Sequence, residues 1–111
     1  MSDIPEETQQ KISQLQLFEQ SIQNVLIQKQ QFQSQLVEIE SALNEIGTAK
    51  EVYKIVGNIM VDSKKEDLKK ELASKKEMIE LRIKTLEKQE KNIKEKAAKM
   101  QSEVLEKIKK R

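Results

Sequence analysis

The side chains that most often carry catalysis or hold metals are missing from this sequence of 111 residues. It has no histidine and no cysteine, so the usual general base, the thiol nucleophile and the commonest transition-metal ligands are all absent. Its two glycines, Gly47 and Gly57, are too far apart to form a phosphate-binding loop. Carboxylates are abundant, but they alternate with lysines as on a solvated helix surface. We therefore predict no catalytic residue, no metal site, no cofactor and no enzymatic activity.

Binding through apolar side chains remains possible. One group of such side chains lies in the stretch VYKIVGNIMV, residues 52–61. The Gly57-Asn58 pair fits a two-residue type II′ turn between β-forming residues, and both faces of the resulting hairpin are largely apolar. A lone two-stranded hairpin is marginal in water, and the chain offers no third strand. We expect it to join hairpins of other subunits in a closed sheet or barrel, through Val52, Tyr53, Ile55, Val56, Gly57, Ile59, Met60 and Val61. The alternative is a local reversal element packed on the ends of its own helices.

Long helices must carry this hairpin, because apolar residues recur at spacings of three and four on both sides of it. Before it, the heptad positions run Leu15, Phe18, Ile22, Val25, Lys29, Phe32, Leu36, Ile39, Leu43 and Ile46. Asp3 and Pro5 mark the start of this helix, and Gly47 is expected at its C′ position. The pattern predicts a helix over residues 5–46.

The second apolar seam continues through Leu72, Ile79, Ile83, Leu86, Ile93, Ala97, Met100 and Val104. Ser63 and Glu66 have the spacing of a capping box at its start. Lys76 and Glu90 fall where apolar residues are expected. We predict a helix over 64–110, and hence a mostly α protein: a long antiparallel two-helix coiled coil with a central β-hairpin, in one domain of residues 1–111.

Folding the chain back at its middle brings the two seams into register and sets Lys29 about one turn from Glu90. A lone polar pair in an apolar seam fixes the alignment of two helices at some cost in stability. The alternative is that both side chains extend to water.

Charge is uneven along the chain. Residues 1–47 hold 2 basic and 7 acidic side chains, and residues 48–111 hold 19 basic and 12 acidic ones. The lysines of the second half are interleaved with glutamates and lack aromatic neighbours, so we do not expect nucleic-acid binding. Neither a signal peptide nor a membrane span is indicated, and without cysteine we expect a cytoplasmic protein with no membrane partner.

Apolar residues also gather near the two chain ends, on the seam and beside it. They are Ile12, Leu15, Phe18, Met100, Val104, Leu105 and Ile108. They either complete the seam or offer adaptable, weakly selective contact to other polypeptides.

Two coiled-coil helices joined by this hairpin resemble the β-type subunit of the archaeal prefoldin (GimC) family over essentially the whole chain. The likeness is carried by Tyr53, Lys54, Val56, Gly57, Ile59, Met60 and Val61, and more weakly by Gln28-Lys29-Gln30 and Gln89-Glu90. It implies an ATP-independent chaperone subunit in a hexamer of two α-type and four β-type subunits, whose hairpins build a β-barrel platform.

The resemblance also implies partners and sites. The seven apolar residues near the chain ends would capture non-native polypeptides, which are delivered to a group II chaperonin. The basic cluster Lys107, Lys109, Lys110 and Arg111 would contribute to docking on that chaperonin. The rival readings are a structural coiled-coil tether without chaperone activity and a helical arm that positions RNA.

Overall fold

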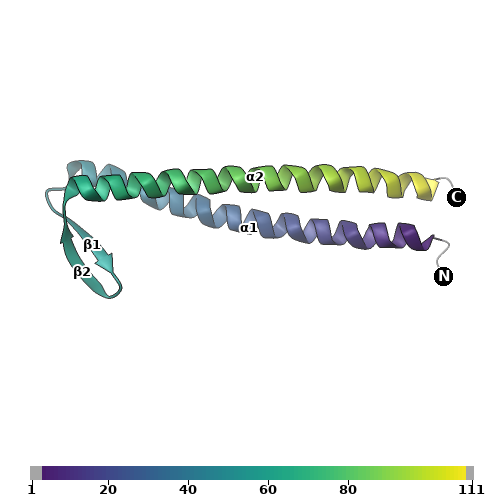
Figure 1. Cartoon of the computed structure of the whole chain (residues 1–111), viewed down its shortest axis with the longest axis horizontal. Helices are drawn as coiled ribbons and strands as arrows, with labels where there is room; N and C mark the ends of the chain where they lie inside the picture. The colour runs from purple at the N-terminus through teal and green to yellow at the C-terminus, as the bar shows by residue number, and fades with distance from the viewer. Residues whose placement is uncertain (1–3, 110–111) are drawn as a thin grey trace. The chain divides into compact units, whose positions relative to one another are not determined.

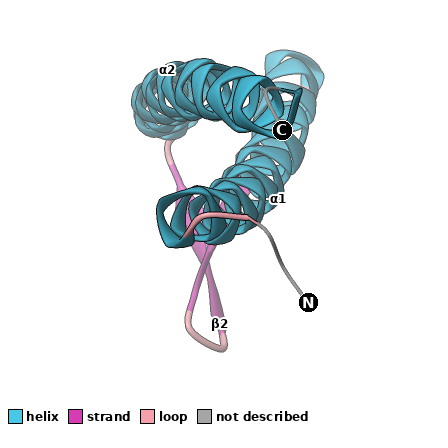
Figure 2. Cartoon of the chain, turned by 90° about the vertical axis from the view of Figure 1, so that its right-hand side faces the viewer, coloured by secondary structure: helices cyan, strands magenta, loops and turns pink. Residues whose placement is uncertain are grey.

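In the computed structural model, which describes residues 4–109, the chain is helix, hairpin and helix. Helix α1 spans Glu6–Thr48, strands β1 and β2 span Val52–Val56 and Ile59–Ser63, and helix α2 spans Lys65–Lys109. Figure 1 follows the chain through these elements. Figure 2 shows that only short loops join them. The predicted fold class is confirmed.

The described chain forms two compact units, each built from part of α1 and part of α2. The hairpin unit comprises Gln30–Lys84, and the terminal unit comprises the remainder, up to Lys29 and from Thr85 onward. No helix among residues 4–109 is long and apolar enough to cross a bilayer.

The hairpin unit has the denser apolar seam. Ile39, Ile79 and Ile83 are buried together. Phe32, Leu36, Leu43 and Leu72 pack against them, and all seven residues belong to the two seams that the sequence pattern predicted. Full burial of an Ile or Leu side chain contributes about 1.5–3 kcal/mol. The Arg82 guanidinium lies 5.7 Å from the centre of the Phe32 ring and covers this end of the seam by a cation–π contact.

In the terminal unit the seam begins earlier than the sequence pattern suggested. Val25, Leu86 and Val104 are buried, and so is Thr8, which is only 2% exposed and lies one heptad before Leu15. A salt bridge of 3.1 Å from Lys11 Nζ to Glu103 Oε2 crosses between the helices near both ends of the described chain.

The end of α1 differs from the prediction. The helix continues through Gly47 to Thr48, and Gly57 is the only residue between 4 and 109 with a positive φ, so Gly47 is not a C′ residue. The Lys65 ammonium explains the difference, because it donates to the carbonyls of Gly47 (3.3 Å) and Ala49 (3.0 Å). A cation at a helix C-terminus satisfies the last carbonyls and complements the helix dipole, so no left-handed glycine is needed.

The start of α2 also differs. The first helical hydrogen bond runs from the Leu68 N–H to the Lys64 carbonyl at 3.0 Å, which makes Lys64 the N-cap. Ser63, predicted as the capping residue, is instead the last residue of β2. The strand extends past the predicted limit at Val61 because Asp62 and Ser63 pair with Tyr53 and Val52.

Candidate functional site

The hairpin closes through the turn that its sequence predicts. Val56 pairs with Ile59 across a two-residue loop. Gly57 has φ of 62°, whereas Asn58 has a negative φ. This combination of signs fits the type II′ turn and requires glycine at its first central position.

The hairpin exposes almost all of its apolar side chains. Ile55 is 69% exposed, and Ile59 and Met60 are each 65% exposed. Val56, Tyr53 and Val61 are exposed by 56%, 48% and 41%. Val52 alone among the predicted assembly side chains is half-buried. Exposed apolar side chains gathered in one element are typical of surfaces that contact another protein, a membrane or a ligand.

Two polar contacts link β1 to neighbouring residues of the hairpin unit. Lys54 Nζ lies 2.8 Å from Glu71 Oε1 of α2, and the Tyr53 hydroxyl donates to Glu51 Oε2 at 2.7 Å. The hydrogen bond to Glu51, then burial, then the Asp62 carboxylate raise the pKa of Tyr53 above 10.0, so the phenol stays a neutral donor.

Each of the two polar residues in the α2 seam meets a partner from α1. Lys29 Nζ lies 3.3 Å from Glu90 Oε1, and Lys76 Nζ lies 3.9 Å from Glu40 Oε1. Lys29 and Glu90 are 19% and 13% exposed in their side chains, so this pair lies inside the seam rather than in water.

A second lysine completes the site around Glu90. Lys94, one turn along α2, lies 3.3 Å from Glu90 Oε2. Burial by itself raises the pKa of the Glu90 carboxyl, but hydrogen bonds from Lys94 and Lys29, with their charges, outweigh it and hold the pKa below 4.5. The carboxylate is therefore charged at neutral pH and is bonded on both oxygens.

The apolar residues predicted for polypeptide capture divide by exposure. Leu105 is 51% and Ile108 41% exposed, whereas Val104 is 5% exposed and completes the seam. The other four are half-buried: Ile12, Leu15, Phe18 and Met100. Leu105 and Ile108 thus form the open part of this end.

Several exposed apolar residues were not predicted as site residues because they lie off the heptad seam. On α1 they are Leu17, Ile27 and Val37, and on α2 they are Met78 and Leu81. Met78 and Leu81 line one side of a shallow groove on α2 with Ser74 and Lys84. In the sequence each of them is an apolar residue among polar or charged ones. The heptad spacing shows that such a residue lies off the seam but does not show what it contacts.

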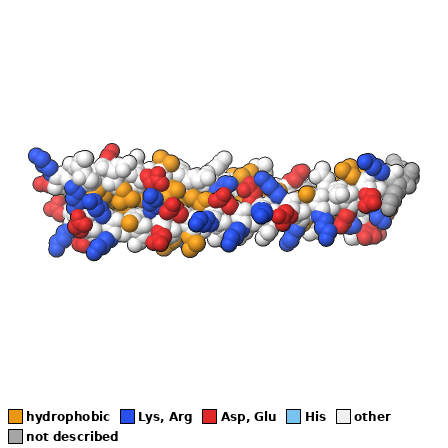
Figure 3. Space-filling view, turned by 90° about the horizontal axis from the view of Figure 1, so that it is seen from above, with side chains coloured by type: hydrophobic (Ala, Val, Ile, Leu, Met, Phe, Trp, Pro, Cys, Tyr) orange, Lys and Arg blue, Asp and Glu red, His pale blue; other side chains and the backbone are white. Residues whose placement is uncertain are grey.

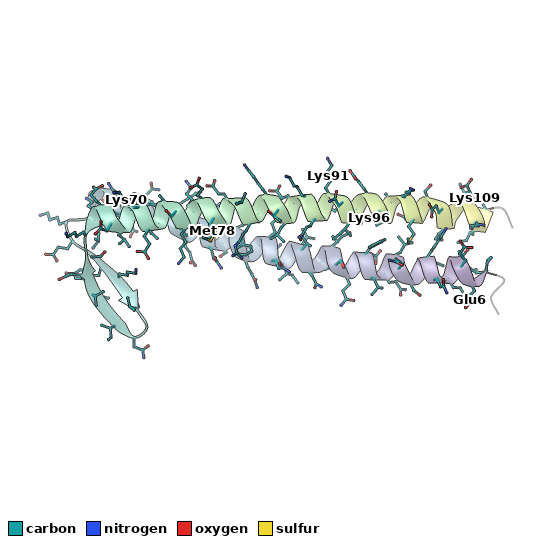
Figure 4. The ribbon with its side chains drawn as sticks, viewed as in Figure 1. Glu6, Lys70, Met78, Lys91, Lys96 and Lys109 are labelled. Carbon is teal, nitrogen blue, oxygen red and sulfur yellow. The ribbon has the colours of Figure 1, made fainter. Side chains whose placement is uncertain are left out.

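Charged side chains of both signs are interspersed over the face seen in Figure 3, with no continuous basic stripe. Figure 4 shows Lys91 on the side of α2 that faces away from α1. Lys107 and Lys109 of the predicted docking cluster are exposed in the last turn of α2. The other two members, Lys110 and Arg111, lie outside the described residues. Among residues 4–109, no group of acidic side chains is arranged to hold a metal ion.

Comparison with known proteins gives one consistent result. The family profile described as "Prefoldin subunit" matches residues 9–111. The prefoldin subunit beta of Archaeoglobus fulgidus is 42% identical over 107 residues, covering 94% of this chain and 92% of that protein. The prefoldin subunit beta of Thermococcus kodakarensis is 36% identical, with the same coverage of both chains.

A solved structure agrees with these sequence relatives. The crystal structure of the prefoldin beta subunit from Thermococcus strain KS-1 matches with a TM-score of 0.86 and 36% identity, over 94% of each chain. The matches extend through both helices and the hairpin. This chain therefore belongs to the prefoldin family, in its archaeal β type, whose members are chaperone subunits that work in complexes with other prefoldin subunits.

Proposed function

We propose that this chain is one subunit of an ATP-independent cytoplasmic chaperone that holds non-native polypeptides and delivers them to a group II chaperonin. It would act in a hexamer of two α-type and four β-type subunits. The observation that carries the proposal is the hairpin, because residues 4–109, which the structure describes, leave six of its apolar side chains 41–69% exposed. Pairing with other hairpins in a barrel removes both the exposed surface and the free strand edges.

Capture is assigned to the terminal unit. Leu105 and Ile108 already offer apolar surface there. The half-buried Ile12, Leu15, Phe18 and Met100 become accessible when the helix ends fray, which costs little free energy at a chain terminus. Several arms in one complex would hold an unfolded chain by avidity, since linked weak sites raise the effective concentration of each contact.

Docking on the chaperonin is assigned to the basic end of α2, at Lys107, Lys109, Lys110 and Arg111. Lys107 and Lys109 are exposed, so an acidic partner surface has access to both. Attraction between exposed charges is screened by salt, and this docking should weaken as the ionic strength rises.

The first experiment is native mass by light scattering, for the chain alone and mixed with an archaeal α-type prefoldin subunit. We expect a complex with the mass of two α-type and four β-type subunits. That complex should suppress the aggregation of a denatured test protein without ATP. A mass that the α-type subunit does not change, together with no suppression, would leave a structural tether as the better account.

A further inference from the structure

One side of α1 in the terminal unit carries no charged side chain. Between residues 12 and 37 only Glu19 and Lys29 are charged, and Lys29 is paired with Glu90 inside the seam. The positions opposite the seam recur at spacings of three and four, which places them on one side of the helix. In the terminal unit they are Ser13, Gln16, Leu17, Gln20, Gln23, Asn24 and Ile27, all exposed, and we call them the amide face.

The glutamine amides of this face are open to a ligand. Gln16, Gln20 and Gln23 make no side-chain hydrogen bond to any other residue between 4 and 109. Together with Glu19 and Ile22 they line a shallow groove of about 420 Å³ on α1. Each amide offers two N–H donors and one oxygen acceptor. The groove therefore suits a ligand that carries both hydrogen-bond acceptors and donors.

Two exposed apolar side chains lie on the same face as these amides. Leu17 is 62% and Ile27 53% exposed. They are ten residues apart, which is about 15 Å along the helix. An extended chain rises about 3.3 Å per residue, so a segment of about five residues reaches from Leu17 to Ile27. Such a segment passes Gln20 and Gln23 on its way.

The lack of charge selects the kind of occupant. About a quarter of the residues of an ordinary folded protein are charged, and charges pressed against the amide face would lose water without gaining a partner. A non-native segment instead exposes apolar side chains and main-chain N–H and C=O groups that no secondary structure satisfies. Glutamine amides can bond those groups whatever the residue type. The complementary occupant is therefore an extended polypeptide segment of low charge.

We propose that the amide face binds the main chain of an extended, uncharged segment of a non-native polypeptide. Gln16, Gln20 and Gln23 hydrogen-bond its peptide groups, and Leu17 and Ile27 contact its apolar side chains. The inference rests on the proposed chaperone function. It adds a second kind of contact, made by hydrogen bonds, on the side of α1 opposite the seam. Recognition of the main chain makes this contact tolerant of the sequence that is held.

Replacing the three glutamines by methionine separates hydrogen bonding from apolar contact. Methionine keeps the length and helix propensity of glutamine and removes the amide, so purely apolar binding would become tighter. In the complex with an archaeal α-type subunit we expect Gln16→Met/Gln20→Met/Gln23→Met to weaken binding of reduced, carboxymethylated α-lactalbumin by about fivefold or more. The control Gln33→Met/Gln35→Met/Gln89→Met, at exposed positions outside the amide face, should keep the original affinity.

A pair of peptides tests whether the main chain is what the amides recognise. One is a fluorescein-labelled decapeptide of alanine, leucine and serine, and the other is the same peptide N-methylated at alternate residues, which removes N–H donors and keeps the side chains. By fluorescence anisotropy, the original complex should prefer the unmethylated peptide about fivefold, and the amide-face methionine variant should bind both alike. This double comparison cancels the effect of methylation on the free peptide. The inference is overturned if the variant keeps the preference or if the original complex shows none.

Photo-cross-linking locates the bound polypeptide without changing the three glutamines, because the chain has no cysteine of its own. A benzophenone label on Asn24→Cys should cross-link to bound carboxymethylated α-lactalbumin. The same label on Lys91→Cys, on the side of α2 that faces away from α1 (Figure 4), should not.

The outcomes distinguish this inference from the proposed function. Equal cross-linking from both sites, none from Asn24→Cys, or unweakened binding by the amide-face methionine variant would overturn the inference and leave the chaperone function standing. An original complex that neither binds the non-native protein nor suppresses its aggregation would reject both.

Discussion

Among single residues, Lys29 and Glu90 depart most from the apolar pattern of the seam that contains them. Their side chains are mostly buried and lie 3.3 Å apart. A buried ion pair contributes little net stability compared with apolar residues of similar size, but it penalises every alignment that leaves one charge without its partner. We infer that this pair fixes the register of α1 against α2 in the terminal unit.

Replacing Lys29 by Leu tests that inference. In Lys29→Leu the buried Glu90 carboxylate keeps Lys94 but loses its partner from α1, so we expect the melting temperature to fall by several degrees. The double variant Lys29→Leu/Glu90→Leu should melt higher than the original chain while its register becomes heterogeneous. Circular dichroism measures the melting, and disulfide trapping between cysteines placed at Ile22 and Ile93 reports the register. Unchanged melting and a single register in both variants would remove the register role.

The same site predicts a dependence on acid. The pKa of Glu90 is lower in the folded chain than its ordinary value of 4.5, so the folded state binds this proton more weakly than the unfolded state. The stabilisation that the charged Glu90 carboxylate gives the folded state is therefore complete above pH 4.5. It is lost as the pH falls through the pKa of Glu90 in the folded state.

Glu90→Gln should remove that part of the acid sensitivity. Below the ordinary pKa of a glutamate carboxyl, the stability of the variant should therefore decline less steeply with falling pH than that of the original chain. Urea unfolding at a series of pH values measures this difference. Glu95→Gln, at an exposed position of the same helix, is the matched control and should keep the original slope. A Glu90→Gln curve that parallels the original one would contradict the assignment.

Among the elements, sequence periodicity predicted both helices and the hairpin because each has one dominant spacing. Ile39, Ile79 and Ile83 recur at heptad positions, and the Gly57-Asn58 turn has few alternatives. The boundaries at Gly47 and Ser63 were wrong because a residue distant in sequence, Lys65, caps α1, and because β2 continues by pairing with β1. The exposed Met78 and Leu81 could not be interpreted, since their place relative to the seam does not say what they contact.

The two glycines make a matched pair of tests for the turn. A side chain at either position would have no atom within 4 Å, so only the backbone distinguishes them. Gly57→Ala should lower the free energy of unfolding by about 1–2 kcal/mol, because φ of 62° is strained for an L-residue. Gly47→Ala, inside α1, should raise it by about 0.5–1 kcal/mol. Urea unfolding of both variants measures the two changes, and a loss of stability in Gly47→Ala would contradict the helical assignment of that residue.

The cap between the helices gives a separate test. Lys65→Met keeps the length of the side chain and removes the donor to the Gly47 and Ala49 carbonyls. We expect the free energy of unfolding to fall by about 0.3–1 kcal/mol, which is the usual stabilisation by a cation near a helix C-terminus. Lys64→Met is the control, because the side chain of Lys64 is exposed. Equal losses in both variants would show that the charge alone, and not the capping contact, is responsible.

For the whole molecule, the proposed capture of non-native polypeptides depends on the exposed apolar residues at the end of α2. We expect Leu105→Ser/Ile108→Ser to reduce suppression of aggregation by several-fold while leaving the mass of the complex unchanged. Leu81→Ser removes an apolar side chain that is 65% exposed in the hairpin unit and should keep full suppression. Aggregation assays on complexes of verified mass provide the measurement. Equal suppression by all three proteins would move polypeptide capture away from the end of α2.

The pairing of Lys11 with Glu103 places residues from near the two ends of the described chain side by side. A pull applied to the two ends therefore loads the terminal unit one layer at a time, first at Lys11 and Glu103 and later at Lys29 and Glu90. The force needed to open each layer depends on that layer alone, because the next layers carry no load until it separates. An arm built in this way separates progressively from its open end under tension.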